Sequence, residues 1–99
     1  MKARLELSPD AERDLLEIGY LIEADSPVAA ARFVRSIERR IEMLSHFPES
    51  GHPRPDLGTG IRGLAFDRKV LVIYRPEPAV VSILRVFYGG KDIGPDDLG

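Results

Sequence analysis

The sequence predicts an α+β domain in which an N-terminal strand and an antiparallel helical hairpin pack on one face of a mainly antiparallel sheet. Two apolar segments rich in β-branched residues, 70–74 and 80–88, flank a proline-containing turn and predict a strand hairpin. Two upstream segments, 9–24 and 27–44, carry apolar residues at helical spacing. Residues 3–7 alternate between apolar and charged, as a short strand does. With one more strand after the helices, the expected order is β-α-α-β-β-β.

The composition is that of a single soluble domain. The chain has 99 residues, of which 43% are apolar and 30% charged, so we expect residues 1–99 to form one unit. Residues 93–99 are rich in glycine and aspartate, and we expect them to form a flexible tail. No apolar run has the length of a membrane span and the charged N-terminus is unlike a signal peptide, so a cytoplasmic location is expected.

The residue inventory argues against several kinds of site. The chain has no cysteine, and its two histidines, His46 and His52, have no partner at metal-ligand spacing, so we expect neither a disulfide nor a metal. His52 lies in a loop rich in glycine and proline, residues 48–60, where a solvated histidine is a simpler interpretation than a general base. The net charge of −2 argues against sequence-independent nucleic-acid binding.

Both helices have a clear start signal. Ser8-Pro9 and Ser26-Pro27 each provide a serine N-cap followed by a proline, which is favourable at the first helical position. The very short break between the helices predicts an antiparallel hairpin. Charges of both signs alternate over the second helix, a pattern typical of a solvated surface, with a basic recognition face as the alternative.

The loop is followed by a predicted strand at residues 61–66, and the last strand, 80–88, contains one unexpected cation. Strict alternation places Arg85 in the apolar row that contains Ile83 and Phe87, although a β-bulge would redirect it. Two interpretations remain open. Either Arg85 lies at the sheet margin with its charge in water, or its face of the sheet is a groove kept open for a ligand or partner.

In this order of elements the chain resembles the ParE/RelE superfamily of bacterial toxins, and the ParE branch most. The resemblance covers nearly the whole chain and rests on LSPDAERDLLEIGYLI, DSPVAAARFVRSIERRIEML, FPESGHPRPDLGTGIRGLAF, VLVIYR and ILRVFYGGKD, in that order. It implies a toxin of a type II toxin-antitoxin system that binds and poisons DNA gyrase and arrests growth. It also implies a hetero-oligomer with a cognate ParD-like antitoxin, no cofactor, no catalytic residue and no sequence-specific nucleic-acid binding by the toxin alone.

Two alternatives follow from the same resemblance. RelE-like members cut messenger RNA on the ribosome, and the cations that match their basic cluster are Arg62, Arg85 and Lys91. No tyrosine or histidine follows Lys91 to serve as acid or base. ParE-like members commonly close with histidine, two small residues and Arg-Asp, whereas this chain has Tyr-Gly-Gly-Lys-Asp at residues 88–92. A non-toxic relative that only binds antitoxin is therefore the third hypothesis.

The resemblance also suggests two functional surfaces. For target binding we expect Arg62, Arg85, Tyr88, Lys91 and Asp92. For antitoxin binding we expect Leu16, Tyr20, Phe33, Arg62, Tyr74 and Arg85, with acidic antitoxin side chains meeting the arginines. Asp92 has an equally good structural role, in which it pairs with Arg62 or Lys91 and anchors the end of the chain.

Overall fold

The computed structural model describes residues 2–67, 69–90 and 92–98. Its elements are β1 (Arg4–Leu7), α1 (Pro9–Glu23), α2 (Pro27–Met43), β2 (His52–Pro53), β3 (Arg62–Phe66), β4 (Val70–Pro76), β5 (Val80–Tyr88) and a 3-10 helix, η1 (Pro95–Leu98). The predicted β-α-α-β-β-β order is confirmed. The additions are β2, a two-residue strand inside the predicted loop, and η1.

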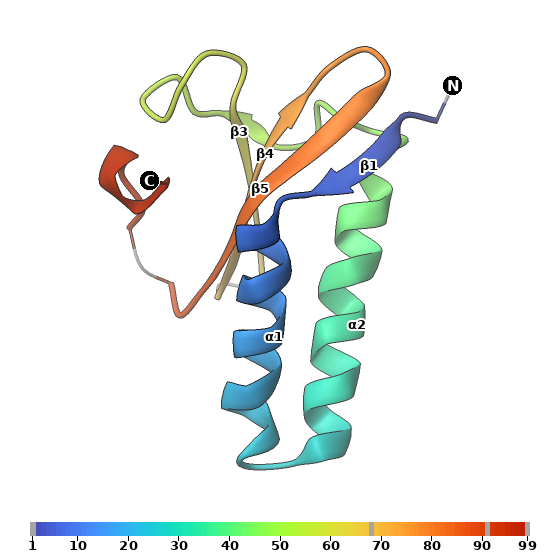
Figure 1. Ribbon diagram of the computed structural model, residues 1–99, viewed down its shortest axis with the longest axis vertical. Helices are drawn as coiled ribbons and strands as arrows, with labels where there is room; N and C mark the ends of the chain where they lie inside the picture. Colours follow the sequence, from blue (N-terminus) through green and yellow to red (C-terminus); the bar gives the residue numbers. More distant parts are fainter. Residues whose placement is uncertain (1, 68, 91, 99) are drawn as a thin grey trace.

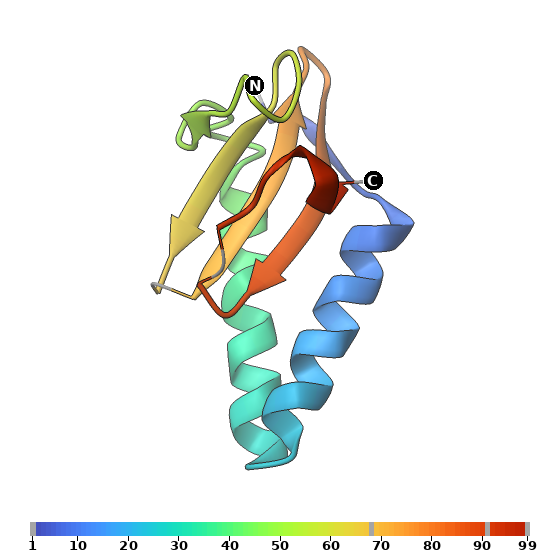
Figure 2. The same cartoon turned by 90° about the vertical axis from the view of Figure 1, so that its left-hand side faces the viewer.

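The five-stranded sheet has the order β1-β5-β4-β3-β2. β1 runs parallel to β5, and every other neighbouring pair is antiparallel. Figure 1 shows α1 and α2 together on one side of the sheet, with the far end of the hairpin extending beyond it. Figure 2 shows the C-terminal segment on the opposite face, across β4 and β5. The sheet therefore separates a helical layer from a thin layer made by the end of the chain.

The predicted helix starts are confirmed. Ser8 Oγ accepts a hydrogen bond from the Ala11 N–H at 3.0 Å, and Ser26 Oγ accepts one from the Ala29 N–H at 3.2 Å. Each serine is followed by proline, whose missing N–H costs nothing in the first turn of a helix.

The main core lies between the helices and the sheet. Its fully buried members include Ile37 of α2, Tyr74 of β4 and Ile83 of β5. A smaller apolar layer lies on the other face, where Ile73 is fully buried and Ile93 is 6% exposed. The segment expected to be a flexible tail thus lies against the sheet, on the face where an open groove was one interpretation of the sequence.

A β-bulge in β5 changes the predicted alternation. Ile73 pairs with Arg85 and Tyr74 pairs with Ile83, so Leu84 is the extra residue. Ile83 and Val86 consequently face the same buried core, and Arg85 faces the other way. The strict alternation expected along this strand is wrong beyond Ile83, because the bulge shifts the period by one residue.

Candidate functional site

Arg85 is held by three parts of the fold. Its Nε donates to Asp14 Oδ2 at 2.7 Å and its Nη2 to Asp14 Oδ1 at 3.0 Å, which makes a bidentate ion pair with α1. Its Nη1 donates to the main-chain oxygen of Asp97 in η1 at 2.9 Å, and its guanidinium lies 4.7 Å from the centre of the Phe87 ring. The hydrogen bond with Asp14 raises the pKa of Arg85 above its ordinary value. Arg85 lies at the sheet margin, but its guanidinium is bonded to Asp14 and Asp97 of the same chain rather than left in water.

Asp14 is the residue that the sequence analysis missed. It is 7% exposed and accepts a further hydrogen bond from the Val86 N–H at 2.8 Å. β1 pairs with β5 only as far as Ile83, so the Asp14 carboxylate satisfies an edge N–H that β1 does not reach. The available signal was its position between Ala11 and Ile18 on the apolar stripe of α1, where an acidic residue requires a buried partner.

Arg62 and Tyr74 are opposite each other on β3 and β4 and both bind the segment that follows α2. Arg62 Nη1 donates to the Gly51 oxygen at 2.6 Å, with a longer contact of 3.4 Å to the Glu49 oxygen. The Tyr74 hydroxyl donates to the Pro48 oxygen at 2.7 Å and accepts from the Gly51 N–H at 2.9 Å. These bonds fix residues 48–51 against the sheet.

Tyr74 is 0% exposed, so its side chain is not available to an antitoxin in this structure. The expectation that it contributes to the antitoxin surface is corrected accordingly. An aromatic residue on an apolar strand faces the core when the helices cover its side of the sheet. The Tyr74 ring packs in the main core, and its hydroxyl hydrogen-bonds the main chain of Pro48 and Gly51.

We expect the burial of Tyr74 to lower the free energy of unfolding at alkaline pH. Burial raises the pKa of Tyr74 above its ordinary value of 10.0 and outweighs the hydrogen bond from Gly51. The stability contributed by the neutral phenol is therefore fully present below the unfolded pKa and is lost as pH rises through the folded pKa. Urea unfolding at about pH 9 and about pH 11 should show a smaller loss for Tyr74→Phe than for the parent protein. Tyr20→Phe, at an exposed position, is the control; a parental pH slope in Tyr74→Phe would contradict this assignment.

Phe33 and Tyr88 come together although the sequence assigned them to different surfaces. Their rings meet edge to face, with centroids 5.5 Å apart and an interplanar angle of 77°. Both side chains are half-buried and pack against the main core. This contact joins α2 to the end of β5.

Asp92 is exposed, and the structure gives it no ion pair with Arg62, whose hydrogen bonds go to main-chain oxygens. The pKa of Arg54 is raised mainly by its hydrogen bond with Asp56, and the Asp92 charge makes a smaller contribution in the same direction. Arg54 Nη2 donates to the Ile93 oxygen at 2.7 Å and so holds the chain end. The expectations for Lys91 lie outside the described residues.

The most accessible expected residues are on the helical hairpin. Leu16 is 61% exposed and Tyr20 is 67% exposed. They border an open groove of about 320 Å³ between the helices, which Gly19, Ala31 and Val34 also line. Exposed apolar side chains beside a groove are typical of a protein-binding surface.

The described part of the chain has neither a candidate metal cluster nor a candidate membrane-spanning helix. Residues 2–67, 69–90 and 92–98 contain no group of three or more metal-ligating side chains. None of the helices in these ranges combines the length and the apolar character needed to cross a bilayer.

The fold is shared by solved chains from toxin-antitoxin systems. One similar structure, titled "Chromosomal ParDE TA system from P. aeruginosa", has a TM-score of 0.74 and 24% identity, over 88% of this chain and 96% of that one. Another, from the RelBE2 toxin-antitoxin complex of Mycobacterium tuberculosis, has a TM-score of 0.65 and 24% identity, over 90% of this chain and all 100% of that one. A curated protein of Sinorhizobium fredii named "Putative toxin Y4kP" is 42% identical over 52 residues, which are 52% of this chain. The match spans 54% of that relative's length.

The family is settled by its sequence model. The model described as "ParE toxin of type II toxin-antitoxin system, parDE" matches residues 5–93, which is most of the chain. The chain therefore belongs to the ParE toxin family, as the resemblance predicted.

Proposed function

We propose that this ParE-family toxin acts by binding and poisoning DNA gyrase, and that a ParD-like antitoxin neutralises it in a hetero-oligomeric complex. The family match over residues 5–93 carries the proposal. On this proposal the protein is a binding inhibitor and not an enzyme. Growth arrest follows because the poisoned gyrase leaves its DNA cleaved.

The arrangement of the cations supports binding more than RNA cleavage. A RelE-like RNase would need cations directed at a phosphate and a nearby acid or base. Arg62 donates to the main-chain oxygen of Gly51, and Arg85 is paired with Asp14. Both are therefore committed to contacts within the chain. The exposed apolar hairpin around Leu16 and Tyr20, in contrast, is suited to a protein partner.

The test is a gyrase supercoiling and cleavage assay run beside an in vitro translation reaction with the same protein. We expect cleaved DNA to accumulate while translation continues. Truncated messenger RNA with intact gyrase activity would favour the RelE-type alternative, and no effect in either reaction would favour a relative that only binds antitoxin.

Variants of the chain end test the proposed target surface. Lys91→Ala and Asp92→Ala should reduce cleaved-DNA accumulation about tenfold or more, if each removes a charged contact with the target. These positions are better choices than Arg62 or Arg85, whose bonds hold the fold. Glu77→Ala, in the exposed turn between β4 and β5, is the control. Full gyrase poisoning by both chain-end variants would move the target surface to the helical hairpin.

A further inference from the structure

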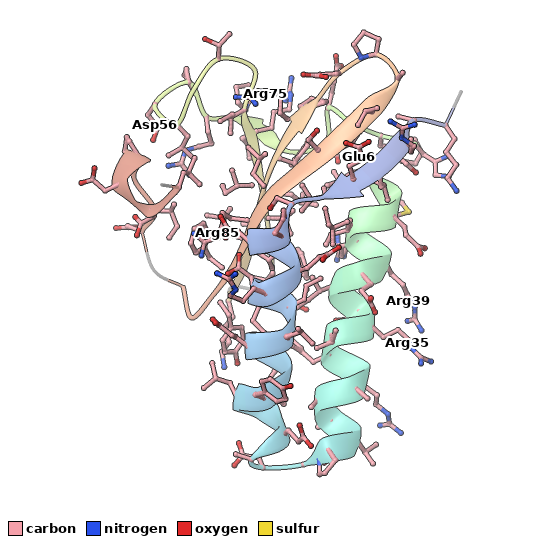
Figure 3. The ribbon with its side chains drawn as sticks, viewed as in Figure 1. Glu6, Arg35, Arg39, Asp56, Arg75 and Arg85 are labelled. Carbon is pink, nitrogen blue, oxygen red and sulfur yellow. The ribbon has the colours of Figure 1, made fainter. Side chains whose placement is uncertain are left out.

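A row of arginines runs along one side of α2. Arg32, Arg35 and Arg39 follow one another at spacings close to one helical turn, which is about 3.6 residues, so they share one side of the helix. All of them are exposed. Figure 3 shows Arg35 and Arg39 pointing away from the body of the molecule, on the side of α2 that is turned away from α1. These residues are called the α2 arginine stripe below.

The stripe carries no bound counter-charge. None of the described residues forms an ion pair with Arg32, Arg35 or Arg39. Glu38 and Glu42 each follow an arginine of the stripe at the i, i+3 spacing that permits such pairs on a helix, yet neither closes one. The guanidinium groups are therefore available to an anion outside the chain.

The residue types on this surface favour phosphate as that anion. Every cation of α2 is an arginine and none is a lysine. A planar guanidinium binds a phosphate through two parallel hydrogen bonds, whereas a lysine acts as a point charge. Beside the stripe lie Pro27, Val28 and Ala31, which with the arginines line an open depression of about 720 Å³. Protein partners are usually anchored by large aromatic contacts, and small side chains such as these do not provide them.

The length of the stripe matches the phosphate spacing of a DNA duplex. Arg32 and Arg39 lie about two helical turns apart, which is about 10 Å along the axis of α2. Each strand of B-form DNA presents a phosphate about every 3.4 Å of axis, so α2 lying along the duplex covers about three phosphates. Among the described residues that line the depression none is aromatic, so the surface lacks the stacking contacts typical of sites for single strands.

We propose that the α2 arginine stripe binds the phosphate backbone of duplex DNA without reading its sequence. Each guanidinium contacts one phosphate of the same strand. Contacts of this kind position a protein on DNA and carry no sequence information. The net charge of −2, which argues against extensive contact with nucleic acid, limits the site to one local surface and makes it weak. The proposal concerns binding by the protein itself and does not depend on gyrase as the target.

The first test is an NMR titration of the unaltered, isotope-labelled protein with a duplex of about 12 base pairs at about 0.1 M salt. We expect the side-chain Nε–H resonances of Arg32, Arg35 and Arg39 to shift more than those of the exposed arginines on β1 and α1. A second duplex of unrelated sequence should bind within about twofold of the first. Larger shifts at Arg54 or Arg62 than at the stripe would overturn the proposal.

Removing the charges of the stripe gives the second test. A triple variant, Arg32→Gln with Arg35→Gln and Arg39→Gln, should bind the duplex about tenfold or more weakly at about 0.1 M salt. Three phosphate contacts predict a slope of about −2.7 for log affinity against log salt concentration, and the variant should bring this slope close to zero. An unchanged slope would overturn the proposal.

A matched variant controls for net charge. Arg4→Gln with Arg13→Gln and Lys69→Gln removes the same charge from exposed positions on β1, on α1 and before β4. At about 0.1 M salt, where the Debye length is about 10 Å, these changes should alter binding about threefold at most. Equal losses in the two triple variants would mean that binding follows the net charge of the protein, and would overturn the assignment to α2.

Two other ligands distinguish duplex DNA from its competitors, and both use the unaltered protein. Tighter binding of a thymidine single strand of about 12 nucleotides would overturn the duplex assignment. Tighter binding of a peptide of about eight aspartates than of the duplex would make the stripe a site for an acidic polypeptide. We expect both ligands to bind more weakly than the duplex, because neither offers phosphates at the spacing of the stripe in a preformed array.

Discussion

Replacing Asp14 with alanine is expected to lower the free energy of unfolding by about 3 kcal/mol. The change removes both carboxylate bonds to Arg85, at 2.7 Å and 3.0 Å, and the bond to the Val86 N–H at 2.8 Å. Breaking a buried ion pair typically costs about 3–5 kcal/mol, and we take the low end because the Arg85 side chain is 25% exposed. The better helix propensity of alanine offsets about 0.5 kcal/mol of this loss.

Urea unfolding of three variants measures this contribution. Asp14→Asn keeps a side-chain oxygen but loses the charge, and should lie between Asp14→Ala and the parent protein. Glu6→Ala removes an ion pair with Arg4 in which both side chains are more than half exposed, and should cost about 0.5 kcal/mol or less. A loss below about 1 kcal/mol in Asp14→Ala would mean that this pair does not hold α1 to β5.

Gly51→Ala is expected to be nearly as damaging, at about 3 kcal/mol, through overpacking and lost hydrogen bonds. A Cβ at Gly51 would lie 2.7 Å from the Tyr74 hydroxyl oxygen and 2.9 Å from the main-chain oxygen of Gly63. One of these contacts is with strand backbone, which cannot move without disturbing the pairing of β3 with β4. The substitution also disturbs the hydrogen bond between the Gly51 N–H and Tyr74.

Two comparisons make the Gly51 measurement specific. Gly94→Ala introduces a Cβ with nothing within 4 Å and should change stability by about 0.5 kcal/mol or less. Combining Gly51→Ala with Tyr74→Phe removes the Tyr74 hydroxyl, the nearest of the atoms that the new Cβ meets, so the double variant should lose less than the sum of the two single losses. Strict additivity would show that the contact with the Tyr74 hydroxyl is not the cause of the damage.

The parts of the fold predicted correctly from the sequence are those set by neighbouring residues. Serine followed by proline determines where α1 and α2 begin, and the apolar segments around the turn determine the β4–β5 hairpin. The sequence did not place β1 beside β5, because parallel pairing between distant strands leaves no local pattern. The packed chain end was missed for a related reason: among its described residues, 92–98, only Ile93 is a buried apolar residue, and glycine and aspartate are its neighbours in the sequence.

The candidate site was predictable by residue type but not by role. Arg85 stood out because it interrupts an apolar strand, yet its partner Asp14 is 71 positions away in the sequence. Arg62 was selected for target and antitoxin binding, whereas its hydrogen bonds in the structure are with the segment after α2. Leu16 and Tyr20 remain accessible, as a binding surface requires. Alternation and spacing report which face a side chain occupies, while the identity of its partner depends on the assembled fold.

The position of β1 has a consequence for the order in which the chain folds. Ser8 Oγ donates to the Leu84 oxygen, 76 residues later, and the one described neighbour of β1 in the sheet is β5. The two helices contact each other locally and can pair early, but the first strand has no place in a sheet until the last one exists. Because synthesis begins at the N-terminus, β1 is made first but cannot pair in the sheet until β5 has been made. The toxin completes its fold only after synthesis has passed Tyr88, so partners that recognise the finished sheet cannot engage the nascent chain before that point.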